Sequence, residues 1–151
     1  VGLTPQTVID YINNHYARPI VATDVGQNQL WTTQFLELKG QHQMLTSGGL
    51  GTMGYGFPAA LGAQIGNPDK RVFAICGDGG VQMNIQEFAT AMHYRLPVTL
   101  IILNNGSFAA NNITVGLSCS AFFISNSVVV AITLAIFPAS LCTFNPTLYC
   151  P

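Results

Sequence analysis

An acidic residue and an asparagine each follow a stretch that reads as a β-strand. Asp78 comes after the run 72–76, within Gly-Asp-Gly-Gly, and Asn105 closes the Asn pair after the run 98–103. Both runs are rich in β-branched residues, and a segment with helical periodicity lies between them, so the two strands should be parallel. Parallel strands end at one edge of a sheet, where open α/β sheets bind ligands. We therefore expect Asp78 and Asn105 to meet at that edge.

This pair of side chains suits a divalent metal ion bound to a phosphate group. Carboxylate and amide oxygens are hard ligands of the kind that Mg²⁺ takes together with phosphates and water. The glycines on both sides of Asp78 leave room for a phosphate. The helix that follows turns its positively polarised N-terminus toward the same place. The alternative is that Asp78 only caps a helix and the asparagines only form a turn, but the strands and the spacing together favour the metal site.

The segment between the two strands predicts one amphipathic helix. Asn84, with Glu87 three positions later, resembles a capping box and places the helix start near Asn84. Four residues with helical spacing are expected to face the core: Ile85, Phe88, Ala89 and Met92.

The chain before this unit alternates between helical and extended patterns. We expect helices from Pro5, capped by Thr4, to about Tyr16, from the loop Asp24–Gln29 to about Leu38, and from Pro58 to about Ile65, with strands at 19–23 and 42–46. This order predicts an α/β fold with a doubly wound, mainly parallel sheet and helices on both faces.

Three loops rich in glycine or polar residues each follow an expected strand. They are the segments 24–29, 47–56 and 77–80, and they should converge on one edge of the sheet. The loops do not match a dinucleotide fingerprint, because no strand, GxGxxG and helix follow one another within one βαβ unit. They do not match a phosphate-binding P-loop either, because no Lys followed by Ser or Thr ends them. Their convergence predicts a ligand site of another type.

Several segments together resemble a known family. TDVGQNQLW, TSGGLGTMGYGFPAALGAQIGNP and GDGGVQMNIQEFATA, followed by the Asn pair, are similar to the carboxy-terminal cofactor domain of the acetolactate (acetohydroxyacid) synthase large subunit, a thiamine-diphosphate enzyme. The resemblance covers about residues 3–105. It implies the thiamine-diphosphate-binding fold, with its sheet truncated at the C-terminus of this chain.

The resemblance also implies which residues hold the cofactor. The metal ligands would be Asp78, Asn105 and the backbone carbonyl of Ser107. The diphosphate would lie against two loops, in contact with Val25, Gly26, Gln27, Asn28, Gly77, Gly79 and Gly80. The family usually has His where this chain has Asn28, although Asn can still donate a hydrogen bond. The aminopyrimidine would contact Gly51 and Met53, with Met53 as the apolar wedge that bends the cofactor.

By the same resemblance, the function is that of a thiamine-diphosphate- and Mg²⁺-dependent carboligase, a transferase of branched-chain amino-acid biosynthesis. It would decarboxylate a 2-keto acid such as pyruvate and join the product to a second 2-keto acid. Full-length members are expected to form homodimers or tetramers, to carry FAD outside this segment and to have a possible regulatory subunit. Two alternatives stay open: another thiamine-diphosphate 2-keto-acid decarboxylase or oxidase, and a non-catalytic cofactor-binding remnant.

No catalytic residue is expected in this chain. The Glu that activates the cofactor in the family lies on a separate domain of a second subunit, and nothing here matches that domain. Glu37 and Glu87 read as a solvated helix face and a cap, and His15, His42 and His93 read as structural. Trp31 and Phe35 read as core or subunit-interface residues. We therefore expect no turnover by this polypeptide alone.

The charges divide the chain into two parts. All eleven Asp, Glu, Lys and Arg residues lie in the first 95 residues, and the net charge of −1 gives no electrostatic case for nucleic acid or an anionic membrane. We expect an incomplete cofactor domain at 1–105 and an unmatched, charge-free tail at 106–151, for which we favour a frameshift or assembly error. A membrane anchor at 117–137 and a genuine extension are the alternatives.

Further expectations concern the chain's ends and cysteines. The start has no initiator Met and no targeting segment, so we expect a piece of a longer protein, cytoplasmic in a bacterium or in the plastid of a plant. The four cysteines have no metal-binding spacing, and Cys76 should be a small buried hydrophobe. Without closing strands, the edge of the strand at 98–103 should stay open, where the apolar tail could pack.

Overall fold

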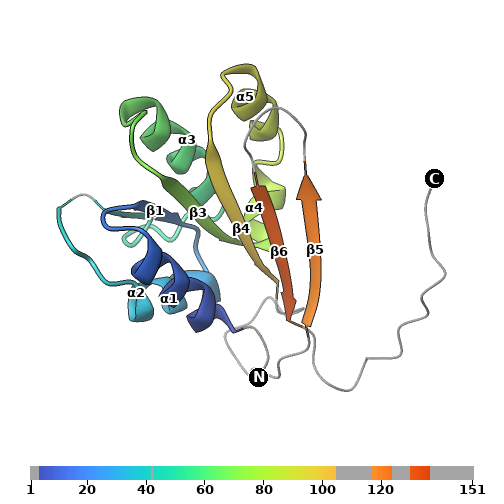
Figure 1. Cartoon of the computed structure of the whole chain (residues 1–151). Helices are drawn as coiled ribbons and strands as arrows, with labels where there is room; N and C mark the ends of the chain where they lie inside the picture. Colours follow the sequence, from blue (N-terminus) through green and yellow to red (C-terminus); the bar gives the residue numbers. More distant parts are fainter. Residues whose placement is uncertain (1–3, 42, 105–116, 124–129, 137–151) are drawn as a thin grey trace.

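A computed structural model describes residues 4–41, 43–104, 117–123 and 130–136, with side chains for the first two ranges (Figure 1). Three residues named above, His42, Asn105 and Ser107, lie outside the described part. The helices are α1 Pro5–His15, α2 Gln27–Phe35, α3 Gly56–Gly66, α4 Asp78–Met83 and α5 Glu87–His93. The strands are β1 Ile20–Thr23, β2 Met44–Thr46, β3 Val72–Gly77, β4 Val98–Asn104, β5 Leu117–Phe123 and β6 Val130–Ile136.

The strands form one sheet in the order β2-β1-β3-β4-β6-β5. Every neighbouring pair is parallel except β5 and β6, which are antiparallel. The predicted α/β fold with a mainly parallel sheet is therefore confirmed.

The edge that we predicted to stay open is occupied. The backbone of β6 pairs with β4 over the register Thr99–Asn104, and β5 pairs with β6 in turn. Unpaired N–H and C=O groups of an edge strand are a template for another strand, which explains why this part of the tail adds to the sheet. Among the described residues, no helix is long and apolar enough to cross a membrane.

Two hydrophobic clusters lie on opposite faces of the sheet, and β3 contributes to both. Its side chains alternate, with Val72, Ala74 and Cys76 on one face and Phe73 and Ile75 on the other. The first face is covered by α3, α4 and α5 and the second by α1 and α2 (Figure 1). This arrangement confirms the doubly wound architecture with helices on both faces.

The first helix begins as its sequence predicts. The hydroxyl of Thr4 accepts a hydrogen bond from the Thr7 N–H at 3.1 Å, and Pro5 occupies the first helical position. The side chains of Ile9 and Ile12 are buried against the sheet.

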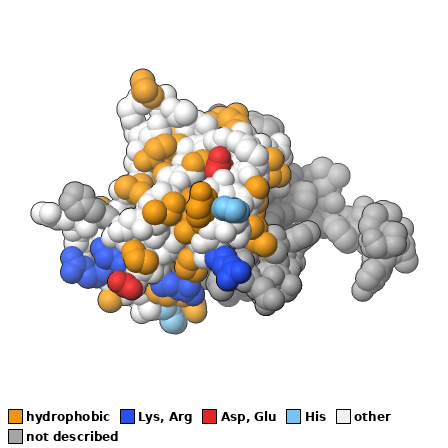
Figure 2. Space-filling view, turned by 90° about the horizontal axis from the view of Figure 1, so that it is seen from above, with side chains coloured by type: hydrophobic (Ala, Val, Ile, Leu, Met, Phe, Trp, Pro, Cys, Tyr) orange, Lys and Arg blue, Asp and Glu red, His pale blue; other side chains and the backbone are white. Residues whose placement is uncertain are grey.

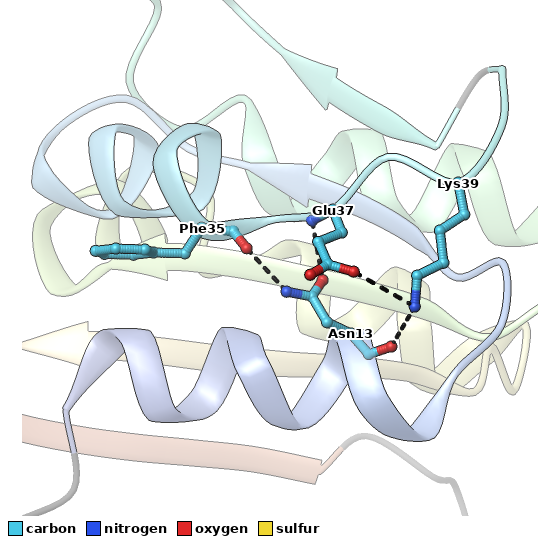
Figure 3. A network of polar contacts seen from close by, with 4 residues as sticks. All are labelled: Asn13, Phe35, Glu37 and Lys39. Carbon is cyan, nitrogen blue, oxygen red and sulfur yellow. Dashed lines mark hydrogen bonds and ion pairs between the residues drawn. The ribbon is translucent and has the colours of Figure 1, made fainter.

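A buried asparagine ties the end of α2 to α1 (Figure 3). Asn13 Nδ2 donates to the Phe35 carbonyl at 2.8 Å, and Asn13 Oδ1 accepts from the Glu37 N–H at 3.0 Å. Lys39 Nζ donates to the Asn13 carbonyl at 2.6 Å and lies 3.7 Å from the Glu37 carboxylate. These bonds end α2 at Phe35, earlier than the expected Leu38, because the chain beyond Phe35 follows α1 instead of continuing the helix.

The predicted single helix between β3 and β4 is wrong, because the segment forms α4 and α5 with a break around Asn84. The predicted capping box is also wrong. The N-cap of α5 is Gln86, and the Asn84 side chain donates instead to the Gly54 carbonyl at 2.6 Å. Two of the four residues predicted to face the core do not: Ile85 lies in the break and is 58% exposed, and Ala89 of α5 is also exposed, whereas Ala91 is buried.

Candidate cofactor site

A pocket of about 280 Å³ opens at the carboxyl ends of β1 and β3. It is lined by residues from the loop before α2 and from α2 itself, from the loop before α3, from the junction of β3 with α4 and from β4. The lining residues are Val25, Gly26, Gln27, Asn28, Trp31, Met53, Gly77, Asp78, Gly79, Gly80 and Leu103. The three loops that the sequence predicts to converge therefore do meet at this edge.

The pocket gathers all the predicted cofactor-binding residues except Gly51, and it includes the predicted metal ligand Asp78. Gly51 is exposed in the loop before α3, with a positive φ of 63°. The register pairs Gly77 with Leu103, so Asp78 and Asn104 each come directly after one member of this pair. The other predicted metal ligands, Asn105 and Ser107, lie outside the described residues.

Two helices begin at the pocket without side-chain caps. The N-cap of α2 is Gly26 and that of α4 is Gly77, and neither makes a side-chain cap hydrogen bond. The first N–H groups of a helix have no partner within the helix, and they carry partial positive charge. Two such N-termini in one pocket favour an anionic ligand there.

Within the described part of the chain, no Lys or Arg side chain lines this pocket. All five Lys and Arg residues of the chain stand in the segments that lead into the strands, at Arg18, Lys39, Lys70, Arg71 and Arg95. These segments lie at the opposite, amino edge of the sheet. Figure 2 shows the molecule from above, with Lys and Arg along one side of this view. An anion in the pocket must be neutralised by backbone N–H groups or by a bound cation.

A buried carboxylate organises the loops behind the pocket, and sequence reasoning did not single it out. Asp24 is 1% exposed, and its carboxylate accepts three backbone hydrogen bonds. Oδ1 accepts from the N–H groups of Val25 at 2.7 Å and Gly54 at 3.0 Å, and Oδ2 accepts from the Gly56 N–H at 2.9 Å. The available signal was an Asp directly after a short, mainly apolar strand, a position at which its side chain can be buried.

Two glycines make room for this carboxylate. A Cβ atom at Gly80 would lie 2.7 Å from Asp24 Cγ, and one at Gly56 would lie 2.7 Å from the Asp24 backbone nitrogen and 2.9 Å from Cys76 Sγ. Burial, together with the negative charge of Asp24, raises the pKa of the Cys76 thiol far above its ordinary value. Cys76 therefore stays a neutral thiol and packs as a small hydrophobe, as its sequence position predicts.

Comparison with known proteins agrees with the geometry. Residues 24–119 match the family model described as thiamine pyrophosphate enzyme, C-terminal TPP binding domain. The chain belongs to this family. Thiamine pyrophosphate and thiamine diphosphate are the same compound, so the predicted family is confirmed. The matched range continues past residue 105, and the domain boundary that we placed there stays a prediction.

Similar proteins are large subunits of acetolactate synthase. The chain is 48% identical over 104 residues to the acetolactate synthase large subunit of Pyropia yezoensis, covering 69% of this chain and 18% of that protein. It is 56% identical over 86 residues to the acetolactate synthase isozyme 1 large subunit of Escherichia coli strain K12, covering 57% of this chain and 15% of that protein. The chain thus spans less than a fifth of the length of these relatives.

Asn28 stands where we expected a phosphate contact in this thiamine-diphosphate domain. Its Nδ2 donates to the carbonyls of Asp24 at 2.7 Å and Ile75 at 3.1 Å, so the amide N–H groups point at the sheet. A donor contact from Asn28 to the diphosphate would therefore come from its backbone N–H at the start of α2. Its side chain joins the ends of β1 and β3 instead.

The residues present fit a diphosphate held through a metal ion. The described residues contain no group of three or more His, Cys, Asp and Glu side chains placed to hold a metal. A hard cation at Asp78 would then complete its coordination with amide, carbonyl, phosphate and water oxygens, as Mg²⁺ does. Trp31, which we expected in the core or an interface, packs against the core and also lines the pocket.

Proposed function

We propose that this chain is the thiamine-diphosphate- and Mg²⁺-binding segment of an acetolactate synthase large subunit or a close relative. The observation that carries the proposal is the pocket itself, in which two uncapped helix N-termini and Asp78 face an anion site without a single Lys or Arg. A diphosphate there needs a divalent cation, and Asp78 supplies the carboxylate that holds one. The names of the relatives favour acetolactate synthesis over other 2-keto-acid chemistry.

The residues of this chain would bind and orient the cofactor. The N–H groups at the starts of α2 and α4 would hold the diphosphate, and Asp78 with Asn105 and the Ser107 carbonyl would hold Mg²⁺. Met53 would support the aminopyrimidine in a bent conformation. The bound cofactor supplies the carbanion chemistry that removes CO₂ from a 2-keto acid such as pyruvate.

The full-length protein would add what this segment lacks. We propose that it carries FAD, assembles as a homodimer or tetramer and binds a regulatory subunit, since the relatives are named as large subunits. Its role would be carboligation in branched-chain amino-acid biosynthesis. Cytoplasmic location in a bacterium, or plastid location in a plant, stays a prediction.

Calorimetric titration of the chain with thiamine diphosphate tests the site. Binding should require Mg²⁺ and disappear with EDTA, because Asp78 repels a diphosphate that carries no metal. Asp78→Ala should weaken binding by roughly 10–100-fold, the range seen when a metal site loses a supporting group. Asp69→Ala, which removes an exposed carboxylate at the other edge of the sheet, is the matched control and should bind as the wild type does. Equal binding by both variants, or binding without metal, would contradict the proposal.

A further inference from the structure

The loop that carries Met53 into the pocket is fixed at the next residue by two side chains from different elements. The Gly54 N–H donates to Asp24 Oδ1 at 3.0 Å, and the Gly54 carbonyl accepts from Asn84 Nδ2 at 2.6 Å. Gly54 is buried and has a φ of 85°, a conformation that favours glycine. Both polar groups of this residue are therefore held, and its backbone has a conformation that residues with a Cβ atom rarely adopt.

Gly54 and Asn84 lie so close together that no side chain would fit between them. A Cβ atom at Gly54 would lie 2.6 Å from Asn84 Nδ2 and 3.1 Å from Met83 Cβ. Asn84 itself stands at the break between α4 and α5, where the Asn84 N–H ends the first helix on the Val81 carbonyl. The break thus directs the Asn84 amide at the loop instead of capping a helix.

Asp24 extends this contact to a second loop of the pocket. Its Oδ1 accepts from Val25 and Gly54 together, and its Oδ2 accepts from Gly56 at the start of α3. Val25 and Met53 both line the pocket. The Val25 N–H bonds to this carboxylate directly, and Met53 comes directly before Gly54, whose N–H also bonds to it. One buried side chain therefore sets the spacing between the two loops.

We infer that Asp24 and Asn84 are positioning residues that clamp Gly54 and thereby hold Met53 at the place where the cofactor's aminopyrimidine would bind. The inference rests on the proposed function for the ligand, but the clamp itself is a property of the free protein. Neither residue is among those that line the pocket. Their effect is to keep the Met53 side chain in one position before the ligand arrives, which lowers the ordering cost of binding.

Asn84→Ala tests the clamp in the full chain, with Asn67→Ala as its matched control. Asn67 is also half-buried, and its Nδ2 donates to the Ala63 carbonyl at 3.1 Å, at the end of α3 away from the pocket. Each variant loses one amide-to-carbonyl bond, and Asn84→Ala also loses the exposed bond that Asn84 Oδ1 accepts from Gln86 Nε2 at 3.1 Å. Because the additional bond is exposed, both variants should lower the melting temperature by a similar amount. Only Asn84→Ala should shift or broaden the Met53 methyl signal in spectra of protein labelled with methyl-¹³C methionine.

Two further measurements complete the test. Amide hydrogen exchange should be slow at Gly54 in the wild type and faster in Asp24→Asn, which keeps the shape of the side chain but loses one acceptor oxygen. Binding of Mg²⁺–thiamine diphosphate, followed by the emission of Trp31, the single tryptophan of the chain, should weaken about fivefold in Asn84→Ala, the effect of one net hydrogen bond. Asn67→Ala should bind as the wild type does.

The outcomes separate the two proposals. A Met53 signal that is unchanged in Asn84→Ala, or that changes equally in Asn67→Ala, overturns the clamp. Wild-type binding of the cofactor with unweakened binding by Asn84→Ala also overturns it and leaves the proposed function standing. A Met53 signal that moves only in Asn84→Ala, in a wild-type chain that binds no cofactor, supports the clamp and overturns the proposed function.

Discussion

Asp24 places a carboxylate in the interior, and no ion pair to it is found among the described residues. Its partners are three backbone N–H groups, at distances of 2.7–3.0 Å. Removing a buried charge from such partners would leave the N–H groups unsatisfied, which typically costs about 1–3 kcal/mol for each group. At the scale of the single residue, this carboxylate therefore explains how flexible glycine loops can form a defined pocket.

The thiol of Cys76 makes the stability of the fold depend on pH. Its pKa is raised in the folded state by burial and by Asp24, whereas an unfolded thiol titrates near 8.5. Above about pH 8.5 the unfolded chain loses a proton that the folded chain keeps, so the free energy of unfolding should fall by up to about 1.4 kcal/mol per pH unit. Below that pH the contribution is fully present.

Urea unfolding of the wild type and Cys76→Ala between about pH 7 and pH 10 checks this expectation. The variant should be less stable at neutral pH but should lack the extra loss at alkaline pH. Because the remaining groups titrate in both proteins, the difference between the two curves reports Cys76. Parallel curves would show that the thiol ionises equally in both states.

At the scale of the element, α4 packs against the Asp24 carboxylate through Gly80. Gly80→Ala should lower the free energy of unfolding by about 1–3 kcal/mol, because the added Cβ would lie 2.7 Å from Asp24 Cγ. Gly62→Ala is the matched control in α3, where an added Cβ meets no atom within 4 Å. That change should stabilise the protein by about 0.4–1 kcal/mol by restricting the unfolded chain. Chemical denaturation of both variants measures the contrast, and equal effects would contradict the packing.

Elements were predictable where the periodicity of the sequence and the fold agree. The strands around Ala74 and Leu100 are buried on both faces and read as continuous apolar runs, which is typical of parallel sheets. The helix break at Asn84 was not predictable, because the Asn84 side chain bonds to Gly54, thirty positions earlier in the chain. A local helical pattern gives no information about a side-chain hydrogen bond to a distant loop.

The same limit applies to the site. The location of Asp78 and the glycines around it at this edge could be predicted, because parallel strands bring their ends to one edge whatever the side chains are. Their roles in binding stay a prediction. Asp24 could not be assigned its role, since its partners lie on a loop whose path depends on tertiary packing. Asn28 resembles a phosphate ligand by position, yet its amide N–H groups bind the ends of two strands.

At the scale of the whole molecule, we propose that the chain provides one side of a reaction site. We expect no acetolactate from pyruvate when the purified chain is supplied with thiamine diphosphate and Mg²⁺, because the activating Glu is expected on another domain. A product assay checks this, with the isozyme 1 holoenzyme of Escherichia coli as the positive control. Turnover by the wild type that disappears in Asp78→Ala would contradict the expectation.

The separation of charges across the sheet has a kinetic consequence. With every Lys and Arg at the amino edge and Asp24 and Asp78 at the other, no Lys or Arg offsets the two carboxylates at and behind the pocket. A free diphosphate would be repelled on approach, whereas its chelate with a divalent ion is close to neutral and is not. Ion and cofactor should therefore arrive together, and the rate of their capture should change little with ionic strength.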